Sequence, residues 1–187
     1  MGEFDFSVIF DNMPFLLKGM QTTLLLTALA MVGGIVLGTL LALARISSIK
    51  PLSIVAASYI NFFRSLPLIL VIFWFYFLVP LVLGRPVGGF YSVLVAFTLF
   101  EAAYYAEIIR AGITSVRAGQ FQAARALGLT YGQSMRFVVL PQAFRAMVPV
   151  LLTQGIILFQ DTSLVYVVGL KDFLVSAELI ANRDQRL

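Results

Sequence analysis

The sequence predicts an all-α integral membrane protein. Hydrophobic residues make up 60% of its 187 residues and charged residues only 12%, whereas soluble domains carry about 25% charged residues. The apolar residues form several runs of roughly 20, the length that a helix needs to cross a bilayer. Lys and Arg gather in the segments between these runs, where they mark the cytoplasmic side of a membrane. We therefore expect a multi-pass protein.

The composition also excludes several classes of function. The chain has no Cys and no His, which removes disulfides, cysteine nucleophiles and imidazole bases or metal ligands. We therefore expect no metal site and no catalytic residue. Lys18, Lys50 and Lys171 are not preceded by a Gly-rich phosphate-binding loop, so any ATP used must be hydrolysed by another chain. The net charge of +4 comes from loops between apolar runs, so topology explains it better than nucleic-acid binding.

The first predicted span covers about residues 22–43. Leu, Ala and Val dominate it, and Gly33, Gly34 and Gly38 would allow close contact with another helix. Residues 1–18, which precede it, carry more acidic than basic residues and do not resemble a cleavable signal peptide. We expect them to form an extracytoplasmic tail.

Three further spans are predicted. The second covers about residues 54–83, with an interruption at 64–67, where the sequence is Arg-Ser-Leu-Pro and the proline breaks the helix. The third covers about residues 91–109 and the fourth about residues 138–160. The remaining residues, 171–187, mix acidic and basic side chains and are predicted to form a C-terminal extracytoplasmic segment.

The segment at residues 110–145 contains five arginines and no carboxylate. Basic residues at this density place the loop between spans 3 and 4 in the cytoplasm. Within it, alanines favour a short helix at about residues 119–128, with Gly128 as its stop and Pro141 as the start of the next helix. The arginines of the segment are Arg110, Arg117, Arg125, Arg136 and Arg145.

The small residues of this segment resemble the EAA signature of permease subunits of type I ABC importers, E-A-A-x3-G-x9-I-x-L-P. In that family the segment is a cytoplasmic coupling helix that docks into a cleft of the ATPase subunit. Gln122 stands where the family usually has Glu; it removes a charge from that contact but keeps an amide that donates and accepts hydrogen bonds. The spacing matches throughout, and Val138 is a second conservative departure, in place of Ile. The residues at the signature positions are Gln122, Ala123, Ala124, Gly128, Val138, Leu140 and Pro141.

Further segments narrow the resemblance to permeases for polar amino acids: FFRSLPLIL at 62–70, YYAEIIRAGI at 104–113 and QDTSL at 160–164. Over residues 14–186 the chain is most similar to glutamate/aspartate permeases. The resemblance implies a type I ABC transmembrane domain at 19–187 in the bacterial inner membrane. It also implies three kinds of protein partner: a homodimeric ATPase that uses ATP, a second and homologous permease subunit, and an extracytoplasmic amino acid-binding protein.

Several alternatives stay open. The resemblance fits a permease for glutamine, arginine or histidine as well as one for acidic amino acids. A membrane enzyme would need a nucleophile and a base, for which only Ser–Lys or carboxylate arrangements remain. A passive channel would need a filter motif, which the sequence does not show. Permeases of this family normally have a fifth span, and we expect that a sequence ending at Leu187 is truncated rather than complete with four.

Glu101 lies near the middle of the third span, where a bare charge costs at least about 2.5 kcal/mol. It either lines the translocation path or forms a structural pair with a neighbouring helix, for which Arg64 is a candidate. A bare carboxylate would repel an anionic substrate, which favours the pair. The Arg64 guanidinium suits either Glu101 or a substrate carboxylate. Glu107 and Arg110, spaced i,i+3, are predicted to form an ordinary surface ion pair.

The end of the fourth span supplies more candidates for the path. Two glutamines share this helix and offer amide hydrogen bonds to an amino acid zwitterion. The Asp-Thr-Ser that follows either breaks the helix and lines the path or caps a helix that begins at Leu164. The substrate-path candidates are therefore Arg64, Glu101, Gln154, Gln160, Asp161, Thr162 and Ser163.

Overall fold

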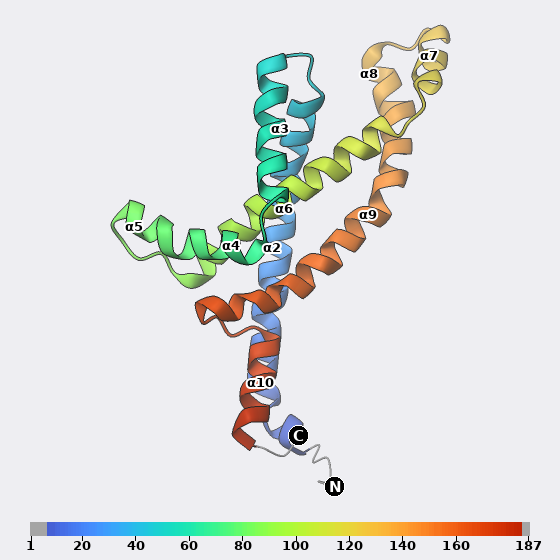
Figure 1. Cartoon of the computed structure of the whole chain (residues 1–187). Coiled ribbons are helices and arrows are strands. Elements are labelled where there is room, and N and C mark those ends of the chain that lie inside the picture. Colours follow the sequence, from blue (N-terminus) through green and yellow to red (C-terminus); the bar gives the residue numbers. More distant parts are fainter. Residues whose placement is uncertain (1–6, 185–187) are drawn as a thin grey trace. The chain divides into compact units, whose positions relative to one another are not determined.

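The computed structural model describes residues 7–184, which form helices and no strands (Figure 1). The all-α prediction is therefore confirmed. Two elements, η1 and η2, are π-helical, and η3 is a 3-10 helix. The elements are α1 (Ser7–Asp11), α2 (Met13–Ile46), α3 (Lys50–Arg64), α4 (Leu68–Phe73), η1 (Trp74–Leu78), α5 (Val79–Leu83), α6 (Gly89–Thr114), α7 (Ala118–Ala126), α8 (Tyr131–Ser134), η2 (Met135–Val139), α9 (Leu140–Asp161), η3 (Thr162–Val168) and α10 (Phe173–Asp184).

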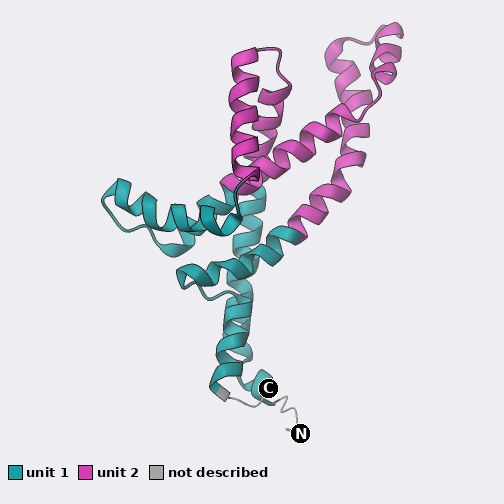
Figure 2. Ribbon diagram, viewed as in Figure 1, with its two compact units in different colours: residues 1–32, 66–98, 157–187 teal, residues 33–65, 99–156 magenta. Residues whose placement is uncertain are grey.

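The chain divides into two compact units, coloured teal and magenta in Figure 2. Unit 1 takes in residues 1–32, 66–98 and 157–187, and unit 2 takes in residues 33–65 and 99–156. The helices α2, α6 and α9 contribute residues to both units. Unit 2 contains the predicted coupling helix and the charged residues of the third span, whereas unit 1 contains both ends of the described chain.

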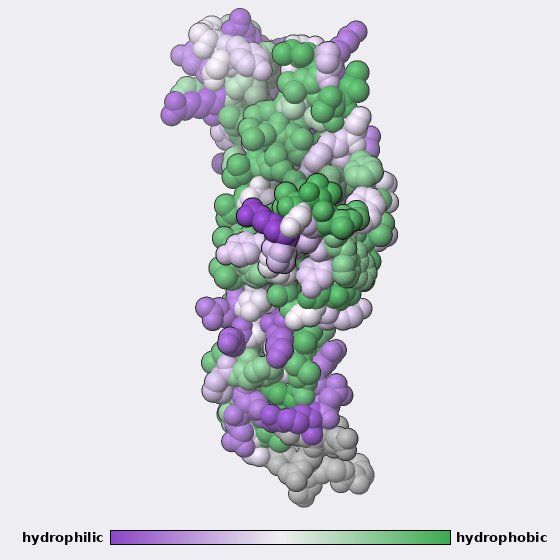
Figure 3. Space-filling view, turned by 90° about the vertical axis from the view of Figure 1, so that its left-hand side faces the viewer, coloured by the Kyte–Doolittle hydropathy of each residue, from purple (hydrophilic) through white to green (hydrophobic). Residues whose placement is uncertain are grey.

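Three helical stretches of the described chain are long and apolar enough to cross a membrane: Met13–Ile46, Gly89–Thr114 and Tyr131–Val168. A fourth span results if α3 and the helix Leu68–Leu83 form one broken span. Hydrophobic side chains make up much of the face seen in Figure 3, and some are very open, such as Val82 at 83% exposure. Apolar surface of this extent suits contact with lipid or a partner rather than water.

The helix break predicted within the second span is confirmed. α3 ends at Arg64 and α4 begins at Leu68. Pro67 lies at the N-cap of α4 with extended backbone angles, φ −65° and ψ 135°. The chain leaves the helix here because proline lacks the N–H of a helix interior and disfavours helical geometry in the residue before it. The Ser65 hydroxyl donates to the Phe62 carbonyl at 2.8 Å and so satisfies one carbonyl at the end of α3.

Within unit 2, α2 and α6 approach closely because α2 has glycines at the contact. A Cβ atom on Gly38 would lie 2.9 Å from the Ala102 carbonyl oxygen and 2.9 Å from the Tyr105 Cβ. One on Gly34 would lie 3.0 Å from the Tyr105 ring. The small-residue face predicted for this helix is thus confirmed at these two positions. The side chains of Tyr105 and Glu101 on the facing helix are 0% exposed.

The helix of the predicted fourth span begins at Tyr131, before residue 138. Thr130 is its N-cap: the Thr130 hydroxyl accepts from the Gln133 backbone N–H at 3.3 Å, and Gln133 Oε1 accepts from the Thr130 N–H at 2.8 Å. This reciprocal arrangement is a capping box. The element α9 itself begins at Leu140, so Pro141 lies in its first turn, as predicted. The helical stretch extends before it through η2 and α8 to Tyr131.

Both predicted tails lie partly outside the described residues, at 1–6 and at 185–187. The described part of the N-terminal tail is helical and comprises α1 and the start of α2. The described part of the C-terminal segment is mostly the helix α10. The side of the membrane on which these segments lie stays a prediction.

A buried aspartate begins α10 in unit 1. Asp172 is 2% exposed, and its carboxylate accepts from the backbone N–H groups of Leu174 at 3.3 Å and Val175 at 3.0 Å. These bonds satisfy donors that a helix start leaves open. The Phe173 N–H donates to the Thr23 hydroxyl at 3.1 Å, which ties α10 to the first part of α2.

Candidate functional site

A buried carboxylate on α6 lies at the centre of the candidate site in unit 2. Glu101 is 0% exposed. Nε2 of Gln154, on α9, donates to both of its carboxylate oxygens, at 3.2 and 3.0 Å. Hydrogen bonds to a charged group offset part of the cost of burying it. Gln154 is therefore a partner of Glu101, whereas the sequence suggests Arg64 as the partner. Of the two roles considered for Glu101, the geometry supports the structural one, in which it links α6 to α9.

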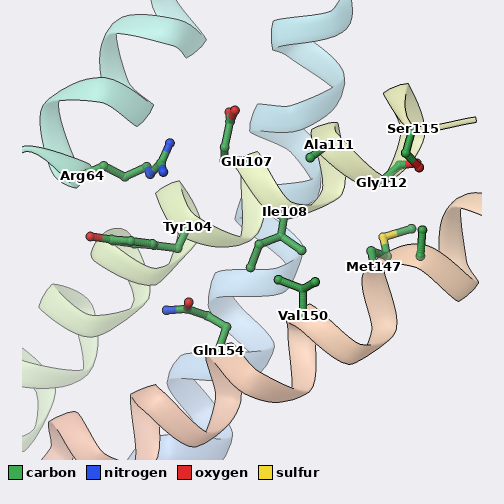
Figure 4. Close-up of a pocket in the computed structure, with 11 residues that line it drawn as sticks. Arg64, Tyr104, Glu107, Ile108, Ala111, Gly112, Ser115, Met147, Val150 and Gln154 are labelled. Carbon is green, nitrogen blue, oxygen red and sulfur yellow. The ribbon is translucent and has the colours of Figure 1, made fainter.

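A cavity of about 420 Å³ opens beside this pair, between α3, α6 and α9 of unit 2. Arg64, Tyr104 and Gln154 supply polar groups to its wall, and Ile108 and Val150 are among its apolar residues (Figure 4). The Arg64 guanidinium carbon lies 5.5 Å from the centroid of the Tyr104 ring, a cation–π contact. Cavities of this size with a few polar groups in an apolar wall suit small molecules.

The acidic residue of the cavity lining is paired with arginines that do not line the cavity. Glu107 lines the cavity, and Arg110 contacts its carboxylate through Nε at 3.1 Å and through Nη2. The predicted i,i+3 pair is thus confirmed. Arg45, on α2, adds a second guanidinium with its Nε 3.9 Å from the same carboxylate. Because these two arginines offset the charge of Glu107, the Arg64 guanidinium in the lining is left to attract anions.

The remaining path candidates, at the end of α9, belong to unit 1. Gln160 is exposed, and Asp161 and Ser163 are half-buried. The Thr162 hydroxyl is buried and donates to the Phe159 carbonyl at 2.7 Å. Asp161 makes no side-chain cap bond to η3. The interpretation of this stretch as a side-chain cap is therefore wrong. The helix η3 follows α9 without a gap, so the chain changes from α-helix to 3-10 helix and no new helix start needs a cap.

The predicted coupling helix, at about residues 119–128, corresponds to α7 and its C-terminal turn. The N–H of Gly128 donates to the Arg125 carbonyl at 3.0 Å, and the N–H of Leu129 donates to the Ala124 carbonyl at 3.2 Å. Gly128 has a φ of 86°, so this is a Schellman ending, which a glycine adopts without strain. The predicted stop at Gly128 is confirmed.

The residues of the coupling signature differ in exposure. On α7, Gln122 and Ala123 are exposed, whereas Ala124 is only 3% exposed. Leu140 and Pro141, at the start of α9, are exposed. Of the three signature residues on α7, only Ala124 is buried, and the first two are left open to a partner.

Three polar features of unit 2 are not predicted from the sequence. A local pattern marks one of them, because Thr130 and Gln133 follow a glycine stop with capping-box spacing. The others join distant residues: Gln142 Nε2 donates to Gln120 Oε1 at 3.3 Å between α9 and α7, and Tyr104 meets Arg64. No short pattern marks contacts of that kind.

Comparison with known proteins identifies the family. The sequence model of the binding-protein-dependent transport system inner membrane component matches residues 34–187. The chain belongs to this family. Its all-α fold, its several apolar helices and its resemblance to type I ABC importer permeases agree with that membership, and the predicted location in the inner membrane is confirmed.

Individual relatives are similar over most of their length. The chain is 54% identical to the glutamate/aspartate import permease protein GltK of Escherichia coli O6:H1, over 98% of this chain and 85% of GltK. It is 39% identical to the arginine transport system permease protein ArtQ of Bacillus subtilis, over 91% of this chain and 78% of ArtQ. A solved amino acid ABC transporter with histidines superposes with a TM-score of 0.88 at 36% identity, over 97% of this chain and 85% of that one.

Proposed function

We propose that this permease carries acidic amino acids, glutamate and aspartate, through an ATP-driven importer. The observation that carries the proposal is the 54% identity to a glutamate/aspartate permease across nearly the whole chain. The relatives that carry other amino acids, such as the arginine permease at 39% identity, are more distant. Permeases for glutamine, arginine or histidine are the alternative that the test must exclude.

The charges of the unit 2 cavity support an anionic substrate. Glu101 is fully buried and hydrogen-bonded by Gln154, so its carboxylate is held away from the open part of the cavity. Glu107 is neutralised by arginines. Arg64 lies exposed at the cavity wall, against an aromatic ring. A guanidinium in this position suits a substrate carboxylate, which it can bind through two parallel hydrogen bonds.

Uptake into reconstituted vesicles tests the substrate. The chain, the second permease subunit, the ATPase and the binding protein are reconstituted together, and labelled glutamate is followed with and without internal ATP. We expect ATP-dependent uptake that unlabelled aspartate suppresses and unlabelled arginine does not. Arg64→Gln should lower uptake at least about tenfold, as expected when a charge-assisted contact worth roughly 1.5–3 kcal/mol is lost.

Arg85→Gln is the matched control, because Arg85 is an exposed loop residue of unit 1 and the substitution removes the same charge. It should leave uptake unchanged. Uptake that does not need ATP would contradict the importer mechanism. Equal uptake of glutamine or arginine would contradict only the acidic substrate class.

We also propose that α7 docks on a separate, homodimeric ATPase subunit, which uses the ATP, and that this chain binds no cofactor. The exposed Gln122 and Ala123 and the 84% exposed Leu127 would enter a cleft of that partner. Gly128 sets the direction in which the chain leaves α7. Leu140 and Pro141 complete the signature at the start of α9. A second, homologous permease subunit and an extracytoplasmic amino acid-binding protein complete the proposed complex.

Co-purification tests this docking. The double variant Gln122→Arg, Gly128→Pro places a long cation on the exposed face and a residue with a fixed negative φ where φ is 86°. It should abolish recovery of the ATPase with the tagged permease. Gly119→Ala is the control, since a Cβ at Gly119 meets nothing within 4 Å. Recovery of the ATPase with the double variant would contradict the docking surface.

A further inference from the structure

A second cavity lies in unit 1, and no residue of the coupling signature lines it. It has a volume of about 340 Å³ and is lined by the first turns of α2, the start of α6, the loop between η3 and α10, and the start of α10. Lys18 and Lys171 supply its charged groups, and Phe15, Phe90 and Leu170 are its large apolar residues. None of its lining residues among those described is acidic.

The two lysines come together only through the fold, since they belong to opposite ends of the chain. The ammonium nitrogen of Lys171 lies 5.9 Å from the centroid of the Phe15 ring, which holds it beside α2. The nearest acidic side chain in sequence, Asp172, accepts backbone N–H bonds at the start of α10. Its carboxylate is thus directed at the start of α10 and does not line the cavity, whose lining carries only the two basic groups.

The wall of the cavity also contains a buried hydroxyl without a hydrogen bond. Ser176 is 1% exposed, and its Oγ has no hydrogen-bond partner among the described residues. A Cβ on Gly19 would lie 2.5 Å from this oxygen, so α10 sits tightly against α2 at this point. A buried polar group without a partner is costly, and a ligand oxygen in the cavity would satisfy it.

The predicted membrane topology does not account for these lysines. The loops richest in Arg predict an extracytoplasmic side for residues 1–18 and 171–187, where basic residues are disfavoured. Lys18 lies in the second turn of α2, near the N-terminal end of the candidate span Met13–Ile46. We therefore place the cavity near the level where an apolar span gives way to the headgroup region.

We infer that this cavity binds an anionic phospholipid of the outer leaflet. The ammonium groups of Lys18 and Lys171 hold the headgroup phosphate, and Phe15, Phe90 and Leu170 contact the glycerol and upper acyl carbons. A lipid fits better than a soluble oxyanion because the charged and apolar residues lie side by side in one cavity at the membrane interface. The binding does not depend on the transported substrate.

Native mass spectrometry of the full-length chain tests the inference. The protein is released from nanodiscs that contain equal amounts of phosphatidylcholine and phosphatidylglycerol, and the ratio of retained lipids is measured. We expect phosphatidylglycerol to be retained preferentially. Lys18→Gln and Lys171→Gln should each lower that preference about fivefold, which is about 1 kcal/mol per basic residue, and the double variant should abolish it.

The chain supplies its own control. Lys50, its only other lysine, is exposed at the start of α3 in unit 2, so Lys50→Gln removes the same charge and should leave the preference unchanged. Replacement of both cavity lysines by arginine should preserve the preference, and size-exclusion profiles should show that all variants are folded.

Three results would overturn the inference. The first is an unchanged preference in the double glutamine variant. The second is an equal loss in Lys50→Gln, which would show a general charge effect. The third is displacement of the lipid by excess free glutamate or inorganic phosphate, which would assign the cavity to a soluble oxyanion instead.

Discussion

Two regions of unit 2 hold their polar groups in different ways. In the coupling segment most of the bonds are local: the Gly128 N–H reaches Arg125, and Thr130 and Gln133 cap each other, with one longer bond from Gln142 to Gln120. At the cavity, beside the local pair of Glu107 and Arg110, a bond between distant residues joins two helices, since Gln154 and Glu101 are separated by 53 positions. Because its bonds are mostly local, the coupling segment can keep its conformation while its exposed side chains contact a partner protein. The cavity wall exists only when three helices are assembled.

Substitution of Gly38 by valine should have the largest effect, because it attacks the assembled helices directly. The new side chain would collide with backbone atoms of Ala102 and Ala106. We expect a loss of roughly 3 kcal/mol in the free energy of unfolding, the upper end for overpacking, measured as a lowered melting temperature in detergent. Gly119→Ala, in the coupling segment, should be neutral or stabilising. Equal losses of unfolding free energy in the two variants would contradict the proposed difference between the two regions.

Removal of the Gln154 amide should have the next largest effect. Gln154→Leu deprives the buried carboxylate of Glu101 of two hydrogen bonds, and we expect a cost of about 2 kcal/mol. Glu101→Gln should lower the free energy of unfolding by less, because this substitution removes the buried charge that requires hydrogen-bond donors. A double-mutant cycle with Leu and Gln at these positions should show coupling above about 0.5 kcal/mol. Additive effects would show that the two side chains act independently.

A branched side chain at Gly128 should disturb the coupling segment and leave the rest of the chain intact. Gly128→Val places a β-branched residue at φ 86°, at a cost of about 1–2 kcal/mol. Since nothing packs there, hydrogen exchange should rise in α7 and stay unchanged in α6. Gly132→Ala, at an equally open position without a positive φ, serves as the control. Faster exchange in α6 would mean that the coupling segment supports the cavity.

Loss of the capping box should have the smallest effect. Thr130→Ala removes the acceptor for the Gln133 N–H and should cost about 1 kcal/mol. Amide exchange in α8 should rise, and Thr130→Ser should restore protection because serine keeps the hydroxyl. Thr130→Ala should lower the melting temperature much less than Gly38→Val does. An equal decrease would show that the cap stabilises the whole chain and not only the local turn.

The local features were open to prediction because they depend on neighbours in sequence. Apolar runs predicted the membrane helices, Pro67 predicted the break before α4, and Gly128 predicted the end of α7. Pro141 predicted the start of α9. The helical extension before it, back to Tyr131, has a local cause as well, since Thr130 and Gln133 form a capping box there. A helix begins where its open N–H groups find acceptors.

The sequence by itself determined the membrane class, the coupling signature and the family, because hydrophobicity and motif spacing are properties of the linear chain. Only the tertiary structure decided that Gln154 is a partner of Glu101, that Arg64 meets Tyr104, and that Lys18 and Lys171 share a cavity. Those pairings depend on which helix faces which, and that choice rests on the close packing of small residues such as Gly38 against a particular neighbour. No single segment of the chain carries that information.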